Sequence, residues 1–394
     1  MLSLLRRDAA KLILLMAAVL LASVGCADQD GGAESARHAA ISFTDLADRR
    51  IELDQLPQKF IVANYIANFM MTGGAESLNK VAGMALDGWE QIRYGEYKAF
   101  TDAFPQMKGG SGGIASIGGY HDDMLNAELI VSLKPDVIIM SPSQFVENNH
   151  HVSIFKRAGI AVVVLDYHSQ KLENHVKSTE ILGLLLDRSS IAKEQNDAYI
   201  QAIKVVNERI AALPEERKNK KVYVELGNKG VNEYGNSYSN AMLWGAIVNN
   251  LGADNMGAGL PDGYGVLDKE FVIASDPDVI FIAGAIWSGD DHNDQMRMGF
   301  TVDEETAQAR LARFADRPEW VHMKAVRNGE VYAVDHGSLR NMIDYVFTQF
   351  MAKALYPDIF ADLDPEQTMH DFYETYLPEL EYSGTFMIKL ERTE

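Results

Sequence analysis

The stretch Glu128-Leu-Ile-Val-Ser-Leu-Lys-Pro-Asp136-Val-Ile-Ile139 recurs later in the chain as Glu270-Phe-Val-Ile-Ala-Ser-Asp-Pro-Asp278-Val-Ile-Phe281. In both copies the proline follows the glutamate by seven positions. Because proline cannot continue a helix, each copy predicts a helix that ends before the proline, then a turn and a buried apolar strand. A unit of this kind used twice predicts two similar lobes with a ligand cleft between them.

Runs of apolar residues in each half of the chain predict the strands of two sheets. They cover residues 60–65, 137–140 and 161–165, and then 221–225, 279–283 and 330–335. Continuous apolar strands that alternate with helices are typical of mostly parallel sheets covered on both faces. The fold class is therefore α/β, with two Rossmann-like lobes. Residues 84–119, which are rich in aromatic side chains, are predicted to be irregular.

Residues 189–213 predict a single long helix between the lobes. Apolar side chains recur there at helical spacing, as at Tyr199, Val206 and Ile210. A helix of this length spans about 36 Å and would make a stiff connection. The sequence therefore predicts an N-terminal lobe at residues 41–188, a connecting helix at residues 189–213 and a C-terminal lobe at residues 214–394.

The first 26 residues have the features of an export signal. Three basic residues precede fourteen uncharged ones, a run shorter than the ~20 residues of a membrane span. Cys26, the only cysteine of the chain, follows directly and resembles the acylated cysteine of bacterial lipoproteins. The resemblance implies a lipid-anchored protein, exported to the periplasm or the outer face of the cytoplasmic membrane, with residues 27–40 as a flexible tether. An ordinary cleaved signal with an incidental cysteine is the alternative.

The composition argues against several classes of function. The chain has 36 basic and 56 acidic residues, a net charge of −20, and such a surface disfavours nucleic acid and anionic lipid headgroups. With Cys26 as the only thiol, none is left for disulfides, iron–sulfur clusters or a nucleophile. The sequence has no nucleophile elbow between a strand and a helix and no His-Glu-x-x-His pair, so we do not expect an enzyme.

Four further segments resemble, by their order and spacing, one known family. They are residues 44–53, Gly159-Ile-Ala-Val-Val-Val-Leu-Asp166, Leu251-Gly-Ala-Asp-Asn255 and Trp320-x5-Val-Arg-Asn-Gly-Glu-Val-Tyr332. With the two glutamate units, they make the chain similar to bacterial periplasmic solute-binding proteins of the helical-backbone class, which serve ABC importers of ferric siderophores, haem and cobalamin. The chain is longer than the usual member because of insertions near residues 84–118 and 288–312, which we expect to flank the cleft.

The resemblance implies a monomer that binds a small metal chelate and delivers it to an ABC permease dimer with its ATPase subunits. In this family one glutamate on each lobe meets arginines of the two permease subunits, and Glu128 and Glu270 fall at those positions. Arginine and carboxylate pair in bidentate geometry. Two carboxylates on lobes joined by a stiff helix would therefore give two-point docking.

Residues that follow the predicted strands, or precede the two glutamate helices, are candidates for the ligand cleft, because ligands of open α/β sheets lie beyond the carboxyl ends of the strands. These candidates are aromatic, polar or cationic: Tyr120, Gln144, Tyr167, Tyr264, Trp287, His336 and Arg340. Flat rings suit a catecholate or a macrocycle, arginine suits an anionic chelate, and tyrosine or histidine can complete a coordination sphere. We therefore expect a ferric siderophore or a similar iron chelate, with cobalamin or haem as alternatives and a nickel chelate after them.

Two other classes of function remain open. A receptor for bare zinc, manganese or nickel could use His150 and His151 with residues 121–123. Adjacent histidines of a strand point to opposite faces, however, and related receptors draw three or four ligands from both lobes, so we predict no metal-ligating residues and no cofactor. A lipid-anchored sensor or adhesin would bind its ligand without needing both glutamates.

Overall fold

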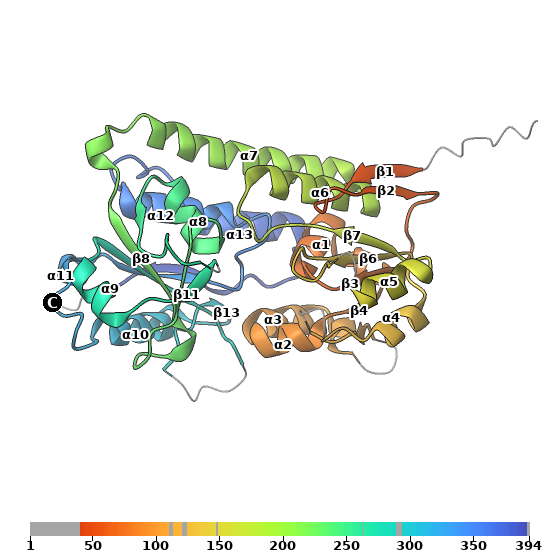
Figure 1. Ribbon diagram of the computed structural model, residues 1–394, viewed down its shortest axis with the longest axis horizontal. Coiled ribbons are helices and arrows are strands. Elements are labelled where there is room, and N and C mark those ends of the chain that lie inside the picture. The colour runs from red at the N-terminus through yellow and green to blue at the C-terminus, as the bar shows by residue number, and fades with distance from the viewer. Residues whose placement is uncertain are drawn as a thin grey trace, which may run out of the picture. The chain divides into compact units, whose positions relative to one another are not determined.

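The computed structural model describes residues 40–109, 113–119, 124–146, 149–261, 263–288 and 294–391 (Figure 1). The predictions for Cys26, Tyr120 and residues 121–123 lie outside this part of the chain. Residues 39–394 form one compact unit. No helix within the described ranges is long and apolar enough to cross a bilayer.

The first lobe is built on a five-stranded sheet in which each strand runs parallel to its neighbours. The strand order is β5-β4-β3-β6-β7. The strands are Phe60–Val62 (β3), Val81–Met84 (β4), Ala115–Ser116 (β5), Val137–Met140 (β6) and Ala161–Val164 (β7). Every residue of β3 and β6 is buried, which confirms the prediction of a parallel sheet covered on both faces.

Helices and one hairpin complete the first lobe. The hairpin consists of β1 (Ile41–Thr44) and β2 (Arg50–Leu53), which pair antiparallel. The helices are Ile66–Gly73 (α1), Leu86–Ile92 (α2), Tyr94–Ala103 (α3), Ala127–Leu133 (α4), His150–Arg157 (α5) and Leu172–Leu186 (α6), with 3-10 turns at Ala75–Lys80 and Pro105–Lys108.

The prediction that residues 84–119 are irregular is wrong, because α2 and α3 occupy much of this segment. Trp89, Arg93, Glu96 and Phe100 follow one another at helical spacing. The backbone leaves the helical region at Arg93, with φ −144° and ψ 55°. This break divides one periodic run into two short helices, and neither is long enough to give a clear signal by itself.

The second lobe has a five-stranded sheet with the order β10-β8-β12-β14-β16. Its strands are Lys221–Leu226 (β8), Asp254–Asn255 (β10), Val279–Gly284 (β12), Val331–Asp335 (β14) and Met387–Lys389 (β16). All neighbours are parallel except β14 and β16. Two small antiparallel pairs join Asn236–Tyr238 (β9) with Tyr264–Val266 (β11) and Gly299–Phe300 (β13) with Gly384–Thr385 (β15).

Helices of the second lobe cover its sheet. They are Leu243–Asn250 (α8), Lys269–Ser275 (α9), Glu304–Ala315 (α10), Lys324–Asn328 (α11), Tyr345–Leu355 (α12) and Pro365–Tyr376 (α13), with 3-10 turns at Glu215–Arg217 and Gly227–Lys229. Each of α10 and α13 begins after an aspartate whose side chain accepts a backbone N–H of the first turn.

The duplicated sequence unit forms the same local structure in both lobes. Helices α4 and α9 each have seven residues and begin after Asn126 and Asp268, whose side chains accept the backbone N–H three positions on. Both helices end at a residue in the left-handed conformation, Lys134 with φ 49° and Asp276 with φ 47°. The left-handed residue redirects the chain before the proline, which cannot extend the helix.

The aspartate after each proline ties the unit to the neighbouring strand. Asp136 accepts the backbone N–H groups of Gln58 and Lys59 at 2.7 and 2.9 Å, just before β3. Asp278 accepts the N–H of Lys221 at 2.8 Å, at the start of β8. The repeated Pro-Asp pair therefore fixes where the adjacent central strand enters each sheet.

Helix α7 (Ser189–Ala211) is the predicted long connection, with 23 residues. It packs against α6 of the first lobe and α12 of the second (Figure 1). Its buried side chains include Tyr199, Val206 and Ile210, so the predicted apolar stripe is the face that covers both lobes.

The two sheets share one hydrophobic cluster, which contains Phe60 and Phe100 of the first lobe with Phe281 and Phe300 of the second, and each lobe has a further cluster of its own. The two predicted insertions meet within the shared cluster, where the rings of Phe100 and Phe300 lie 6.0 Å apart. The N–H of Gly95 also donates to the carbonyl of Ile286, just before the second insertion, at 3.2 Å. The lobes are therefore joined at a second place besides α7.

Candidate functional site

The carboxyl ends of strands from both sheets bring polar and aromatic side chains together between the lobes. Tyr65 follows β3, and His168 follows β7. The Tyr65 hydroxyl lies 2.7 Å from Nδ1 of His168. Burial raises the pKa of Tyr65 well above its usual value, so its hydroxyl stays protonated and shares a hydrogen bond with the imidazole, whose tautomer sets the direction.

The second lobe contributes His336, which follows β14 and is enclosed by aromatic rings. Nε1 of Trp244 donates to its Nδ1 at 3.0 Å. The ring of Tyr238 stacks at 6.1 Å between centroids, and that of Trp287 lies at 5.6 Å. Because Nδ1 accepts a hydrogen bond, the neutral ring carries its proton at Nε2. The indole N–H of Trp287 is buried and has no partner within the described chain.

Both histidines of this group are held in the neutral form. Burial, then the charge of Arg340 and that of Arg93, lower the pKa of His168 and of His336 well below 6.5. The neutral imidazole is the form that coordinates metal ions. One histidine comes from each lobe, and Nδ1 of each already has a hydrogen-bond partner, so Nε2 is the ring nitrogen left to meet a ligand.

Arg340 is the central cation of the site. It is 5% exposed, and its guanidinium donates to the carbonyl of His336 at 3.2 Å. Its Nε has no hydrogen-bond partner among the described residues. Burial and the neighbouring Arg93 lower the pKa of Arg340 to about 9. A buried cation without a counterion is unfavourable, so the site is electrostatically prepared for an anionic group.

A small pocket lies at Arg340 and is bounded by both lobes. Its walls include Tyr65 and Asn68 of the first lobe and Gly337 of the second, together with Trp89, Arg93 and Glu96 of the α2–α3 insertion. The free space is about 20 Å³, enough for roughly one water-sized group. Only a small part of a large ligand therefore fits here in this conformation.

Glu96 lines the pocket, and Asp335 ends β14 nearby. Glu96 accepts the indole N–H of Trp89 at 2.7 Å, and Asp335 accepts the N–H of Ser338 at 2.7 Å. Burial raises the pKa of both groups, because it disfavours the charged form. Glu96 lies 4.0 Å from Arg93 as an ion pair, whereas Arg340 has no carboxylate partner among the described residues.

Two of the residues predicted to bind ligand are held inside the first lobe. Gln144 is fully buried, accepts the N–H of Ser141 and donates to the carbonyl of Ala63, each at 3.0 Å. It joins the ends of β3 and β6. Tyr167 is also fully buried, and its hydroxyl bonds that of Thr179 at 2.9 Å. Both side chains are buried, and Tyr167 supports the site through its ring contact with Tyr65 at 5.0 Å and through its backbone N–H, which donates to the Tyr65 hydroxyl at 3.4 Å.

The other predicted ligand residues lie at the cleft. His336, Arg340 and Trp287 belong to the cluster described above. Tyr264 of β11 pairs directly with Tyr238 of β9, so both side chains project from one face of the hairpin. Tyr264 is 51% exposed, which places it at the rim beside the buried Tyr238.

Sequence reasoning missed Arg93 and Glu96 and did not select Tyr65. Arg93 and Glu96 lie in the insertion that was predicted to be irregular, although the helical spacing from Trp89 to Phe100 was a signal that could have identified them. Tyr65 was read as the end of a strand. The structure instead ends β3 at Val62 and gives Tyr65 a left-handed backbone with φ 60°.

Glu128 and Glu270 lie on the surface, outside the pocket. Each is the second residue of its helix, in α4 and α9, and is exposed. Within the described ranges neither forms an ion pair with another side chain. The structure therefore leaves both carboxylates available, and their docking role stays a prediction.

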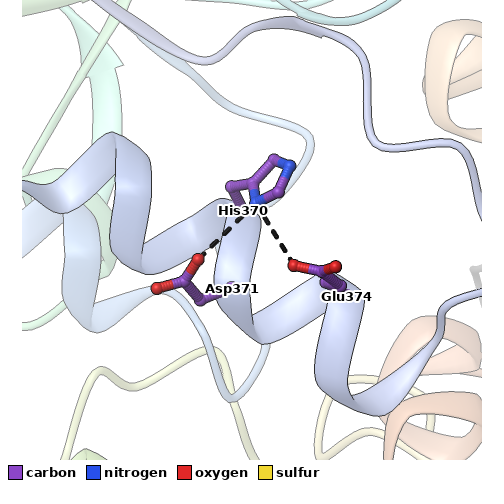
Figure 2. A group of neighbouring side chains, drawn as sticks. All are labelled: His370, Asp371 and Glu374. Atoms are coloured by element: carbon purple, nitrogen blue, oxygen red, sulfur yellow. Dashed lines mark ion pairs between the residues drawn. The ribbon is translucent and has the colours of Figure 1, made fainter.

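The histidine pair and one further cluster bear on the bare-metal alternative. His150 and His151 begin α5 rather than a strand. On α13, His370 lies 3.6 Å from Asp371 and 3.9 Å from Glu374, all three exposed (Figure 2). Exposed carboxylates beside a histidine are ordinary ion-pair partners.

Three comparisons with known proteins agree with this architecture. The family model for periplasmic binding proteins matches residues 102–336. The crystal structure of the TroA-like periplasmic binding protein FepB from Veillonella parvula is 31% identical, with a TM-score of 0.80 over 89% of this chain and 100% of that one. The uncharacterised ABC transporter substrate-binding lipoprotein YvrC of Bacillus subtilis is 23% identical over 89% of this chain and 97% of its own length. The molybdate-binding protein MolA of Haemophilus influenzae is 22% identical over 86% and 93%.

Proposed function

The chain belongs to the TroA-like periplasmic binding proteins, and from this we propose that it captures an anionic metal chelate, with a ferric siderophore as the first candidate, and delivers it to an ABC permease. Members of this family act in transport, as carriers of a small ligand to a membrane complex. The proposal concerns the chemistry of the ligand, the docking surface and the anchor.

The observation that carries the ligand class is the buried guanidinium of Arg340, which has no carboxylate partner in the part of the chain that the structure describes. A ligand that brings an anionic oxygen to this group removes the cost of burying the charge. Catecholate and carboxylate chelates of iron present such oxygens around the metal. The imidazole Nε2–H of His336 and the hydroxyl of Tyr65 add polar groups beside the same pocket that can bond a ligand oxygen. A buried cation with such groups around it favours an anionic chelate over a neutral one.

The rest of such a ligand would lie toward the rim. The pocket at Arg340 admits only a small group, whereas the hairpin β9–β11 and Trp287 present aromatic surface next to it. Flat rings pack well on a catecholate or a macrocycle. Haem, which carries carboxylates on a flat ring, is therefore the first alternative among the chelates, and cobalamin follows it.

A small oxyanion is the second candidate. The two arginines that line the pocket suit a compact anion. The relative MolA is described as molybdate-binding. An oxyanion would use the arginines but would leave the aromatic rim unoccupied.

The proposed docking rests on two exposed glutamates, and the proposed anchor rests on the cysteine that follows the apolar N-terminal segment. Glu128 and Glu270 are exposed carboxylates at matching positions of the two lobes, as a two-point contact with permease arginines requires. Cys26 follows the apolar leader, and the relative YvrC is described as a lipoprotein. We infer that acylated Cys26 holds the protein, as a monomer, at the outer face of a membrane beside its permease.

A titration followed by tryptophan fluorescence tests the ligand. The probes are an iron(III) tris-catecholate, haem, cobalamin, molybdate, and free ferric, zinc and manganese ions. We expect the catecholate complex to bind with micromolar affinity or better, about −8 kcal/mol or stronger, and to quench Trp287. Arg340→Ala should weaken binding at least about tenfold, while the exposed Arg50→Ala should not change it. Tight binding of a free ion with no response to any chelate would overturn the proposal.

A further inference from the structure

Arg340 has an unusual backbone for the residue that faces the ligand. Its φ of +82° lies in the left-handed region, which residues with a Cβ rarely adopt. No helix or strand includes it, since it lies between β14 and α12. Other groups must therefore hold the peptide on each side of Arg340 in place.

A side chain of the opposite lobe supplies two of these contacts. Asn68, on α1 and 1% exposed, donates from Nδ2 to the carbonyl of Arg340 at 3.0 Å. Its Oδ1 accepts the N–H of Met342 at 3.1 Å. One amide thus uses both its donor and its acceptor to hold the turn that carries Arg340.

The third contact comes from Asp344, which accepts the N–H of Arg340 at 3.0 Å. The same carboxylate accepts Nε2 of Gln170 at 2.8 Å and the hydroxyl of Tyr199 at 3.1 Å. Gln170 belongs to the first lobe and Tyr199 to α7. The turn is therefore held from the first lobe and from the connecting helix, although Arg340 itself belongs to the second lobe.

From these contacts we propose that Asn68 is a positioning residue for ligand recognition, acting across the cleft by fixing the strained turn that directs the Arg340 guanidinium into the pocket. The inference rests on the proposed function, because it takes Arg340 as a ligand contact. Because Asn68 and Arg340 lie on different lobes, a change in the arrangement of the lobes would also move the Arg340 guanidinium. Loss of Asn68 lets the turn relax, and the guanidinium then leaves its position.

A double-mutant cycle on the dissociation constant tests this proposal. The variants are Asn68→Ala, Arg340→Ala and their combination, titrated in the full-length protein with the tightest binder among an iron(III) tris-catecholate, haem and molybdate. We expect each single substitution to weaken binding about tenfold or more. The double variant should bind within about twofold of Arg340→Ala, because a positioning residue has nothing to add once its target is gone.

Thr72→Val is the matched control. Thr72 lies one turn after Asn68 on α1, is equally buried, and donates to Gln195 at 3.0 Å. Its loss should lower the melting temperature without changing affinity, which separates general destabilisation from positioning. If Asn68→Ala does not fold, the cycle is run with Asn68→Ser, which is small and still polar.

The possible failures are distinguishable. Additive losses in the double variant, or an unchanged affinity in Asn68→Ala, would overturn the positioning role and leave the proposed function standing. An unchanged affinity in Arg340→Ala would remove Arg340 from the site, and the inference with it. If none of the three probes binds the native protein, the proposed ligand class fails first and this inference fails as its consequence.

Discussion

Glu128 and Glu270 occupy the same position, the second residue, of two seven-residue helices that are capped and terminated in the same way. In each copy of the sequence unit an aspartate, Asp136 or Asp278, accepts backbone N–H groups at the start of a neighbouring strand, β3 or β8. The helix of each carboxylate is thus tied to the central sheet of its lobe. The shared core and α7 then limit how far the distance between them can change.

Loss of both carboxylates should abolish transport without affecting ligand capture. We expect Glu128→Ala combined with Glu270→Ala to keep the native dissociation constant, because neither residue lines the pocket. Each arginine-paired carboxylate lost at a buried interface costs about 2–5 kcal/mol. The measurement is uptake by vesicles containing the permease. Glu90→Ala with Glu305→Ala, two other exposed helix glutamates, is the control, and normal uptake by the first pair would exclude the docking role.

Stability should fall as the pH drops below about 6.5. The lowered pKa values of His168 and His336 mean that the unfolded chain binds protons near 6.5 while the folded chain does not. The neutral histidines therefore contribute fully to the stability of the folded chain above pH 6.5, and this contribution is lost as the pH falls below that value. The loss is about 1.4 kcal/mol for each unit by which folding lowers the pKa of a histidine.

Urea denaturation between pH 7.5 and 5 measures this effect, and His168→Gln should reduce the slope. Glu96 and Asp335 have raised pKa values. These two groups contribute fully to stability below the usual pKa of a carboxyl group, and their contribution decreases as the pH rises above it. Their effect on stability therefore has the opposite sign to that of the histidines. An identical slope in native protein and His168→Gln would show that this imidazole is not held neutral.

The contact between the two insertions should be a major source of stability. Phe100 is fully buried and packs on Phe300 of the other lobe. We expect Phe100→Ala to lower the free energy of unfolding by about 3–5 kcal/mol. Phe271→Ala, at a residue 47% exposed, should cost far less.

Solution scattering tests whether the contact between Phe100 and Phe300 limits the movement of one lobe relative to the other. Native protein should show little change in radius when ligand binds, because the lobes are bridged at α7 and again at α3. Phe100→Leu, which keeps most of the volume, is the variant in which a larger change should appear if the protein folds. A large change in the native protein would contradict the double bridge.

Removal of Asp136 should destabilise the start of strand β3. Asp136→Ala loses two charge-assisted hydrogen bonds, to the N–H groups of Gln58 and Lys59. We expect a loss of about 2–3 kcal/mol in the free energy of unfolding, since such bonds contribute more than neutral ones. The exposed Asp54→Ala should have almost no effect in the same denaturation experiment.

The native protein should carry acyl mass at Cys26 and partition into the detergent phase. Cys26→Ser should block this processing, because the thiol is the only site for the lipid. Mass spectrometry of the protein from its native membrane is the measurement. A wild-type protein that is wholly soluble and unacylated would exclude the anchor.

Several features of the fold could be predicted from the sequence because they depend on local patterns. The apolar run at Val137–Met140 forms β6 with the predicted bounds, and α7 begins at the predicted Ser189. The Pro-Asp units ended their helices where proline requires it. The helices of residues 84–119 were not recognised, because the break at Arg93 leaves two segments of seven and ten residues.

The sequence by itself determined the two lobes, the long connection and the duplicated glutamates, since hydrophobic period, proline and caps act over a few residues. Only the tertiary structure decided which side chains form the site. Gln144 and Tyr167 follow strands as ligand residues do, yet the packing of the first lobe buries both. Arg340 became the central cation because Asn68, 272 positions away, holds its turn. Contacts at such separations depend on how the lobes meet, which no local pattern encodes.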